Sequence, residues 1–129
     1  MYLTSQRKHG GFGVGEKKFD RELDGIERMI RGLSRGRVSP GRWLTNNSSG
    51  LIKMEYRVQA IARVTRFLPM EKDQKNRPGK VRWLKYSMDT EKGAVDFIQA
   101  VQSKRPMAVK KAAIALQNNC NQCHREFRL

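Results

Sequence analysis

Three residues near the C-terminus combine side chains that can do chemistry. Cys120, Cys123 and His124 form the sequence Cys-Asn-Gln-Cys-His, which contains the only two cysteines among the 129 residues. On a helix, positions i, i+3 and i+4 lie on one face, so two thiols and an imidazole would point the same way. C-x-x-C-H is the attachment signature of c-type haem, in which the thiols form thioethers and the imidazole binds the iron. The motif therefore predicts one covalently bound haem c.

Three other uses of these cysteines fit less well. A disulfide between Cys120 and Cys123 would leave His124 unexplained and would close only a very short loop, with little gain in stability. A thioredoxin-like redox pair expects strands that alternate with helices, and no strand pattern is present. A zinc site needs four ligands, and only His9 remains as a further histidine. A basic zinc-binding or nucleic-acid-binding module stays as a remote alternative.

The segment that carries the motif has the most regular apolar pattern in the chain. Pro106 suits the first position of a helix, because proline has no N–H to bond there. Apolar residues then recur at alternating steps of four and three, as on one face of a helix, at Val109, Ala113, Leu116, Cys120, Cys123 and Phe127. We expect a last helix from Pro106 with both cysteines on its buried face.

Three further helices are expected from the same kind of pattern. The first begins at Glu16 and ends near 38–41, with an inward stripe of Phe19, Leu23, Ile26, Ile30 and Leu33. A loop is expected at 43–50, where Asn46, Asn47, Ser48 and Ser49 could cap the next helix. That second helix runs from Leu51 to Leu68, and Pro69 stops it.

The second half of the chain continues with a polar linker at 69–80 and a short apolar piece at 81–86. A third helix is expected at about 89–103, with four residues turned inward: Ala94, Phe97, Ile98 and Val101. Four amphipathic helices with one long connection predict an all-α, antiparallel four-helix bundle. Residues 1–15, with four glycines between positions 10 and 15, are expected to form a flexible arm, and 16–129 the haem-binding domain.

The residues after the motif add a resemblance to a known family. His124 is followed by Arg125-Glu126-Phe127-Arg128, so the end of the chain matches C-x-x-C-H-x-x-[Tyr/Phe]-Arg. The sequence therefore resembles the class II c-type cytochromes, cytochrome c′ and its relatives of the cytochrome c556 type. The resemblance implies a bundle with one haem c, with Cys120 and Cys123 as its anchors, His124 as the fifth iron ligand and Arg128 beside the proximal face.

The resemblance also places the residue opposite His124, at the sixth iron position, on the first helix. There the chain offers Met29, with Ile26 and Ile30 around it. A methionine ligand would give a six-coordinate haem suited to electron transfer, because methionine raises the reduction potential. An apolar cover would leave the iron open to small gases such as nitric oxide. Both possibilities stay open, and Met54, Met88 and Met107 are weaker candidates.

The charge indicates the kind of partner. The chain has 27 Lys and Arg against 12 Asp and Glu, and residues 1–50, 51–100 and 101–129 each carry a net charge of +5. Such a spread surface attracts acidic partners without identifying them. We expect an electron carrier or gas-binding protein rather than an enzyme, which binds an acidic redox protein and no nucleic acid.

The ends and the surface of the chain carry the remaining expectations. No stretch approaches the ~20 apolar residues of a membrane span, and the first residues lack the apolar region of a signal peptide. Because haem c is attached outside the bacterial cytoplasm, we expect a processed chain from the periplasm or an equivalent compartment. The resemblance allows a homodimer, while the arginines between Arg28 and Arg42 leave a monomer equally open.

Overall fold

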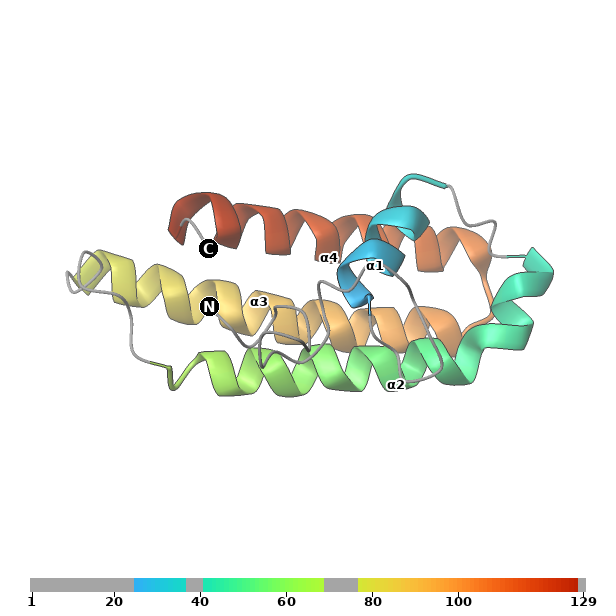
Figure 1. Ribbon diagram of the computed structural model, residues 1–129, viewed down its shortest axis with the longest axis horizontal. Coiled ribbons are helices and arrows are strands. Elements are labelled where there is room, and N and C mark those ends of the chain that lie inside the picture. Colours follow the sequence, from blue (N-terminus) through green and yellow to red (C-terminus); the bar gives the residue numbers. More distant parts are fainter. Residues whose placement is uncertain (1–24, 37–40, 69–76, 128–129) are drawn as a thin grey trace.

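The computed structural model describes residues 25–36, 41–68 and 77–127, and these form four helices without a strand (Figure 1). The helices are α1 (Ile26–Ser34), α2 (Gly41–Thr65), α3 (Arg77–Gln102) and α4 (Pro106–Phe127). The fold is the expected all-α four-helix bundle. The expected arm at 1–15 and the expected start of the first helix at 16–24 lie outside the described residues.

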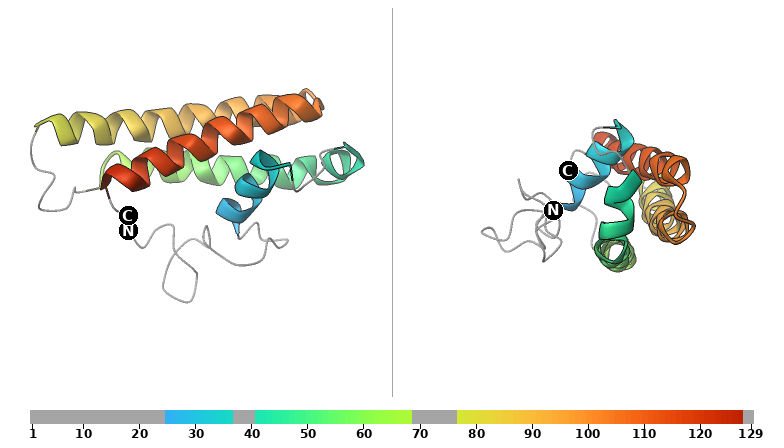
Figure 2. Two further views of the ribbon diagram at one scale, coloured as in Figure 1. Left: turned by 90° about the horizontal axis from the view of Figure 1, so that it is seen from above. Right: turned by 90° about the vertical axis from the view of Figure 1, so that its right-hand side faces the viewer.

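Among the three long helices, α3 runs antiparallel to both α2 and α4, and it lies between them in the contacts of the bundle (Figures 1 and 2). The short α1 packs against α4. Buried side chains from all four helices make one core, with the largest at Phe97, Ile26, Leu33, Leu51, Met54 and Leu116. No helix in the described ranges has a stretch long and apolar enough to cross a membrane.

The loop expected at 43–50 is wrong, because these residues belong to α2, which begins at Gly41. Leu44 is 2% exposed and lies seven residues before the buried Leu51, so tertiary packing extends the apolar stripe backward. The polar side chains that suggested a cap bond within the helix instead. Asn47 Nδ2 donates to the carbonyl of Trp43 at 2.8 Å, and the Ser48 hydroxyl donates to the carbonyl of Thr45.

The start expected for the third helix is also wrong. α3 begins at Arg77 and includes both the end of the expected linker and the piece at 81–86. Two hydroxyl residues, Ser87 and Thr90, interrupt the apolar pattern of its inward face, so the helical period is not evident from the sequence. The residues of this face are Trp83, Ser87, Thr90, Ala94, Phe97 and Val101. Ser87 is only 4% exposed because its hydroxyl donates to the carbonyl of Trp83 at 2.9 Å.

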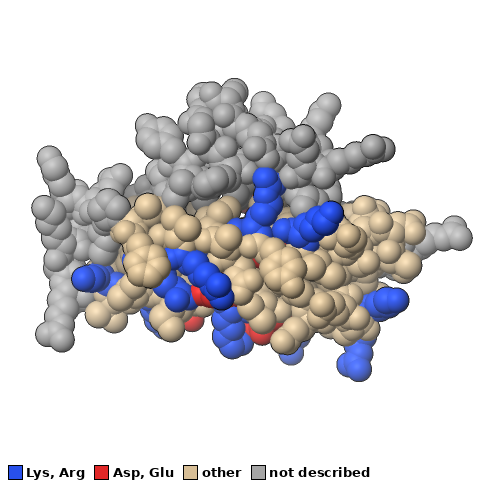
Figure 3. Space-filling model, turned by 90° about the horizontal axis from the view of Figure 1, so that it is seen from below, with Lys and Arg blue, Asp and Glu red and all other residues tan. Residues whose placement is uncertain are grey.

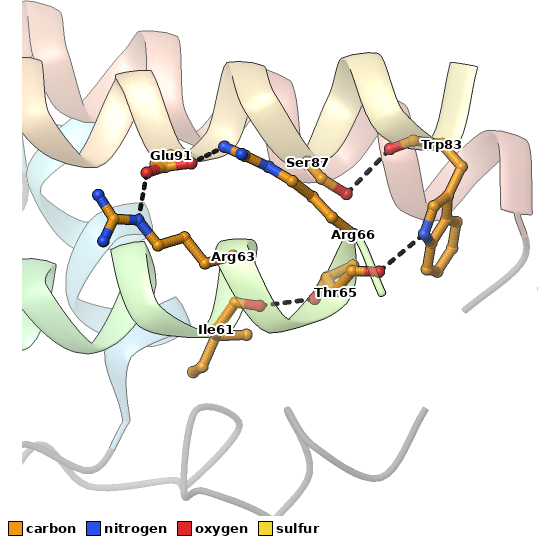
Figure 4. A network of polar contacts seen from close by, with 7 residues as sticks. All are labelled: Ile61, Arg63, Thr65, Arg66, Trp83, Ser87 and Glu91. Atoms are coloured by element: carbon orange, nitrogen blue, oxygen red, sulfur yellow. Dashed lines mark hydrogen bonds and ion pairs between the residues drawn. The ribbon is translucent and has the colours of Figure 1, made fainter. Parts of the chain in front are cut away.

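Contacts between α2 and α3 hold the end of α2, which stops at Thr65 rather than at Leu68 (Figure 4). The indole Nε1 of Trp83 donates to the carbonyl of Thr65 at 2.8 Å and satisfies one of the free carbonyls at the helix end. Glu91 of α3 accepts from Arg63 and also pairs with Arg66. These contacts fix the end of α2 that lies beside the motif-bearing part of α4.

α3 and α4 are joined by a tight turn and approach each other closely. Lys104 in the turn has a left-handed φ of 57°, and its N–H donates to the carbonyl of Val101. Farther along, a Cβ on Gly93 would lie 3.1 Å from a methyl carbon of Leu116, so the absence of a side chain lets the helices approach. α4 then begins at Pro106, as expected, and carries the cysteines.

Candidate cofactor site

The three motif residues lie on one face of α4 and line a single cavity. Cys120 and Cys123 are half-buried, whereas the side chain of His124 is exposed at the edge of the cavity. Four members of the expected stripe are buried: Val109, Ala113, Leu116 and Phe127. The stripe is therefore confirmed as the inward face of α4, and it opens into the cavity where the cysteines begin.

All four helices contribute to the cavity walls. α1 supplies Ile26, Glu27 and Ile30, so the structure brings Ile26 and Ile30 together with the cysteines and the histidine. The other wall residues were not identified as site residues from the sequence. They are Val58, Ile61, Ala62 and Thr65 from α2, Tyr86, Ser87 and Thr90 from α3, and Gln117 and Asn121 from α4. The surface they form is mostly apolar.

The remaining candidates from the sequence are placed differently. Met29 is 9% exposed and packs in the core, but it is not one of the residues that line the cavity. Met54 is fully buried, and Met88 and Met107 are exposed on the surface. Arg128 lies outside the described residues. Among the described residues that line the cavity, His124 is the only histidine and none is a methionine.

The two thiols are free, and their surroundings keep them neutral. Burial, with a smaller effect from the negative charge of Glu55, raises the pKa of the Cys120 thiol to about 12. Burial raises the pKa of the Cys123 thiol to about 11. Reactive redox cysteines need the opposite shift, because the thiolate is the nucleophile. The surroundings of the two thiols therefore disfavour a thiol–disulfide exchange centre, which needs a thiolate.

These pKa values predict slow alkylation of the chain before any cofactor is attached. A pKa of about 11 instead of 9.0 lowers the thiolate fraction of Cys123 at pH 8 about a hundredfold. We expect Cys123 to react with iodoacetamide at least that much more slowly than after unfolding in guanidinium, and Cys120 to react more slowly still. The rates should rise with pH up to the pKa. Time-resolved mass spectrometry measures both, and folded rates equal to unfolded rates would contradict the buried geometry.

Aromatic and polar contacts fix the end of α4 next to His124. Phe127 is 6% exposed, and its ring meets Trp83 and Tyr86 edge to face, at centroid distances of 5.1 and 6.1 Å. Glu126 accepts hydrogen bonds from the hydroxyl of Tyr86 and from Arg82, both at 2.7 Å, and these bonds lower the pKa of its carboxyl. α3 therefore holds the last turn of α4, which carries the histidine.

One acidic residue inside the bundle was not noticed in the sequence. Glu55 of α2 is completely buried, and neither of its carboxylate oxygens has a hydrogen-bond partner among the described residues. Burial raises the pKa of this carboxyl well above its usual value. Its place on the apolar stripe between Leu51 and Val58 was the available signal.

No three His, Cys, Asp or Glu side chains converge into a metal-binding cluster within 25–36, 41–68 and 77–127. The comparisons with known proteins add no relative: no protein-family model, curated protein or solved structure matches this chain. A function for the chain has to be argued from its own residues, of which Cys120, Cys123 and His124 at one cavity form the strongest combination.

Proposed function

We propose that the chain is a monohaem c-type cytochrome that carries electrons, with haem c bound through Cys120 and Cys123 and with His124 as the proximal iron ligand. One observation carries the proposal. The only two cysteines of the chain and the adjacent histidine line the same mostly apolar cavity between four helices. Ligand sites in helical bundles are built in this way, from side chains on facing helices. The resemblance of the sequence to class II cytochromes c implies such a haem site within a helical bundle.

The donor set fits haem c. Two free, neutral thiols at i and i+3 can each add their S–H across a vinyl group, and the sulfur loses no charge in forming the thioether. The imidazole at i+4 shares the face and can bind iron through a ring nitrogen. Bound haem supplies an iron that gains and loses one electron. Ile26, Ile30 and the apolar walls would limit the access of water to a haem held here, and solvent exposure is one of the factors that set a reduction potential.

The basic surface suits a redox partner with an acidic docking surface. Lys and Arg side chains are spread over the face seen in Figure 3, with few acidic groups between them. From 97 to 125, which includes most of α4, the sequence contains no Asp or Glu, and it carries Lys104, Arg105, Lys110, Lys111 and Arg125. Opposite charges raise association rates most at low salt. We expect electron-transfer rates with such a partner to fall as ionic strength rises.

A second candidate function follows from the wall that α1 provides. The apolar α1 residues that line the cavity with the thiols are Ile26 and Ile30, whereas Met29 packs in the core. An apolar cover without a strong ligand is the arrangement that would leave the sixth iron position open to nitric oxide or another small gas. This alternative shares the haem and His124 with the electron carrier and differs only at that position.

A denaturing mass spectrum combined with a visible spectrum tests the proposal. The chain is expressed with an extracytoplasmic leader in a host that attaches haem c, because the proposed location is the periplasm or an equivalent compartment. We expect a mass that exceeds the polypeptide by one haem and a cofactor that survives acid extraction. A low-spin spectrum would support the electron carrier, and a high-spin ferrous spectrum that changes with nitric oxide would support the gas-binding alternative. A colourless protein of polypeptide mass would refute both.

The same preparation tests Met29 as a ligand. If Met29 binds the iron, Met29→Leu converts a low-spin spectrum to a high-spin one, because leucine cannot coordinate. Met54→Leu is the matched control, since Met54 is buried in the same core. Size-exclusion chromatography with light scattering on the wild type distinguishes the monomer from the homodimer.

A further inference from the structure

Glu55 is a charged residue in a position where the fold gains nothing from charge. It is completely buried on the inward stripe of α2, four residues after Leu51 and three before Val58. Both of its carboxylate oxygens lack a hydrogen-bond partner in the described part of the chain. A buried, unpaired carboxylate is destabilising, so an amide or an aliphatic residue would serve the core better. Its presence calls for a counter-charge or a proton.

The described helices offer Glu55 no counter-charge. Burial is the only cause that shifts its pKa, so no described Lys, Arg or His compensates it. Several acids on the neighbouring helices have bases of their own: Glu27 of α1 pairs with Arg31, and Asp89, Glu91 and Asp96 of α3 pair with Lys85, Arg63 and Lys92. On α4, the negative charge of Glu55 acts on the neutral Cys120 thiol.

Glu55 lies close to the cofactor site, although it is behind the cavity wall. Val58 and Ala62, the next residues along its stripe, line the cavity. Its negative charge is near enough to the Cys120 thiol to act on the thiol's ionisation. A group attached through Cys120 would therefore come within electrostatic range of the carboxylate, in an interior where charges are poorly screened.

On the basis of the proposed cytochrome function, we infer that Glu55 is a redox-linked proton-binding residue. Its carboxylate binds one proton from solvent as the iron gains one electron from the redox partner, and it releases that proton when the electron leaves. Ferric iron with ionised Glu55, one electron and one proton become ferrous iron with neutral Glu55. No carbon bond changes, and the charge in the buried region stays constant. The ferric state provides the positive charge that Glu55 otherwise lacks, which favours its ionised form.

The coupling has a defined sign. Where Glu55 is neutral in the ferrous state and ionised in the ferric state, lowering the pH favours reduction, so the midpoint potential falls as pH rises. One proton per electron makes a tenfold change in proton concentration equal to a tenfold change in the equilibrium constant, or about 59 mV per pH unit at most. This slope is confined to the pH range between the pKa of Glu55 in the ferric state and its pKa in the ferrous state. Outside that range Glu55 has the same protonation state in both redox states, and the potential no longer depends on pH.

The test is a potentiometric titration of the holoprotein between pH 5 and 9. Its denaturing mass is measured first, because missing haem refutes the cytochrome assignment and the inference with it, whereas in a haem-loaded protein the titration tests the role of Glu55 alone. In wild type we expect the potential to fall with pH, and in Glu55→Gln we expect this dependence to disappear. Asp96→Asn is the matched control, since Asp96 does not line the cavity and its half-exposed carboxylate pairs with Lys92, and it should keep the wild-type slope. A potential independent of pH in wild type, or an unchanged slope in Glu55→Gln, overturns the inference.

A second measurement covers the case in which Glu55→Gln does not load haem. Infrared difference spectra of the wild type should show the carbonyl band of a protonated carboxyl on reduction, with the expected shift in D₂O. Glu55→Asp keeps an ionisable group and should keep both the band, at a moved frequency, and a pH-dependent potential. A wild-type difference spectrum without a carboxyl band would refute the inference even if the potential depends on pH.

Discussion

Replacing both cysteines, Cys120→Ala with Cys123→Ala, is expected to abolish covalent haem attachment. The double variant should have the mass of the polypeptide alone, because it retains no thiol in the whole chain. Any haem held by His124 and the apolar walls should leave on acid extraction, since no thioether retains it. The measurement is the fraction of protein that carries the haem mass under denaturing conditions, which should fall from nearly all to background.

Single variants and a spacer variant make this result specific. Cys120→Ala and Cys123→Ala should each keep one thioether, and the remaining vinyl group should shift the absorption of the extracted chromophore to longer wavelength. Gln122→Ala, at the exposed position between the cysteines, should load haem as the wild type does. His124→Ala should keep the haem mass, but its visible spectrum should differ from that of the wild type because the iron has lost its proximal ligand. A haem mass retained in the double variant would show that the attachment lies elsewhere.

The helix with the motif was predictable because its start signal and its apolar period both indicate the same helix. Pro106 begins it, the apolar steps of three and four continue without interruption, and the structure has a helix over Pro106–Phe127. The same applies to the inward residues Ala94, Phe97, Ile98 and Val101, all of which are buried. Where apolar residues alone mark the buried face, their period is sufficient.

The incorrect boundaries share one physical cause. Ser87 and Thr90 interrupt the apolar stripe of α3, and Asn47 and Ser48 make the start of α2 look like a loop. Short polar side chains can remain in a helix when they donate to carbonyls of the preceding turn, as Ser87 and Asn47 do. Whether they do so or end the helix depends on burial by other helices, which a single sequence does not specify.

The candidate site was predictable only in part, because a single sequence does not specify which helix faces are buried against one another. The motif specified the three α4 residues, and family resemblance placed Ile26 and Ile30 near them. Which residues of α2 and α3 form the cavity walls depends on how the helices pack, and so does the burial of Glu55. In sequence it is one of 12 acidic residues, marked only by its place on the apolar stripe of α2, and its burial without a partner among the described residues is seen only in the structure.

The stability of the site depends on α3, and Phe97→Ala is expected to destabilise the bundle strongly. Phe97 is the largest fully buried side chain, and α3 packs against both α2 and α4. Removing a buried phenylalanine leaves a cavity and costs about 3–5 kcal/mol of unfolding free energy. Because domains of this kind have only about 5–15 kcal/mol in total, the change should be visible as a large drop in the urea midpoint.

The matched control is Phe67→Ala, which makes the same chemical change where the side chain is 86% exposed. That variant should change the unfolding free energy by no more than about 0.5 kcal/mol. Both are measured on holoprotein by urea unfolding followed by circular dichroism. Phe97→Ala should therefore lose stability. Because thioether bonds do not break on unfolding, any molecule that carries haem should keep its haem when it unfolds. Equal stability of the two variants would mean that Phe97 does not fill the core between α2 and α4.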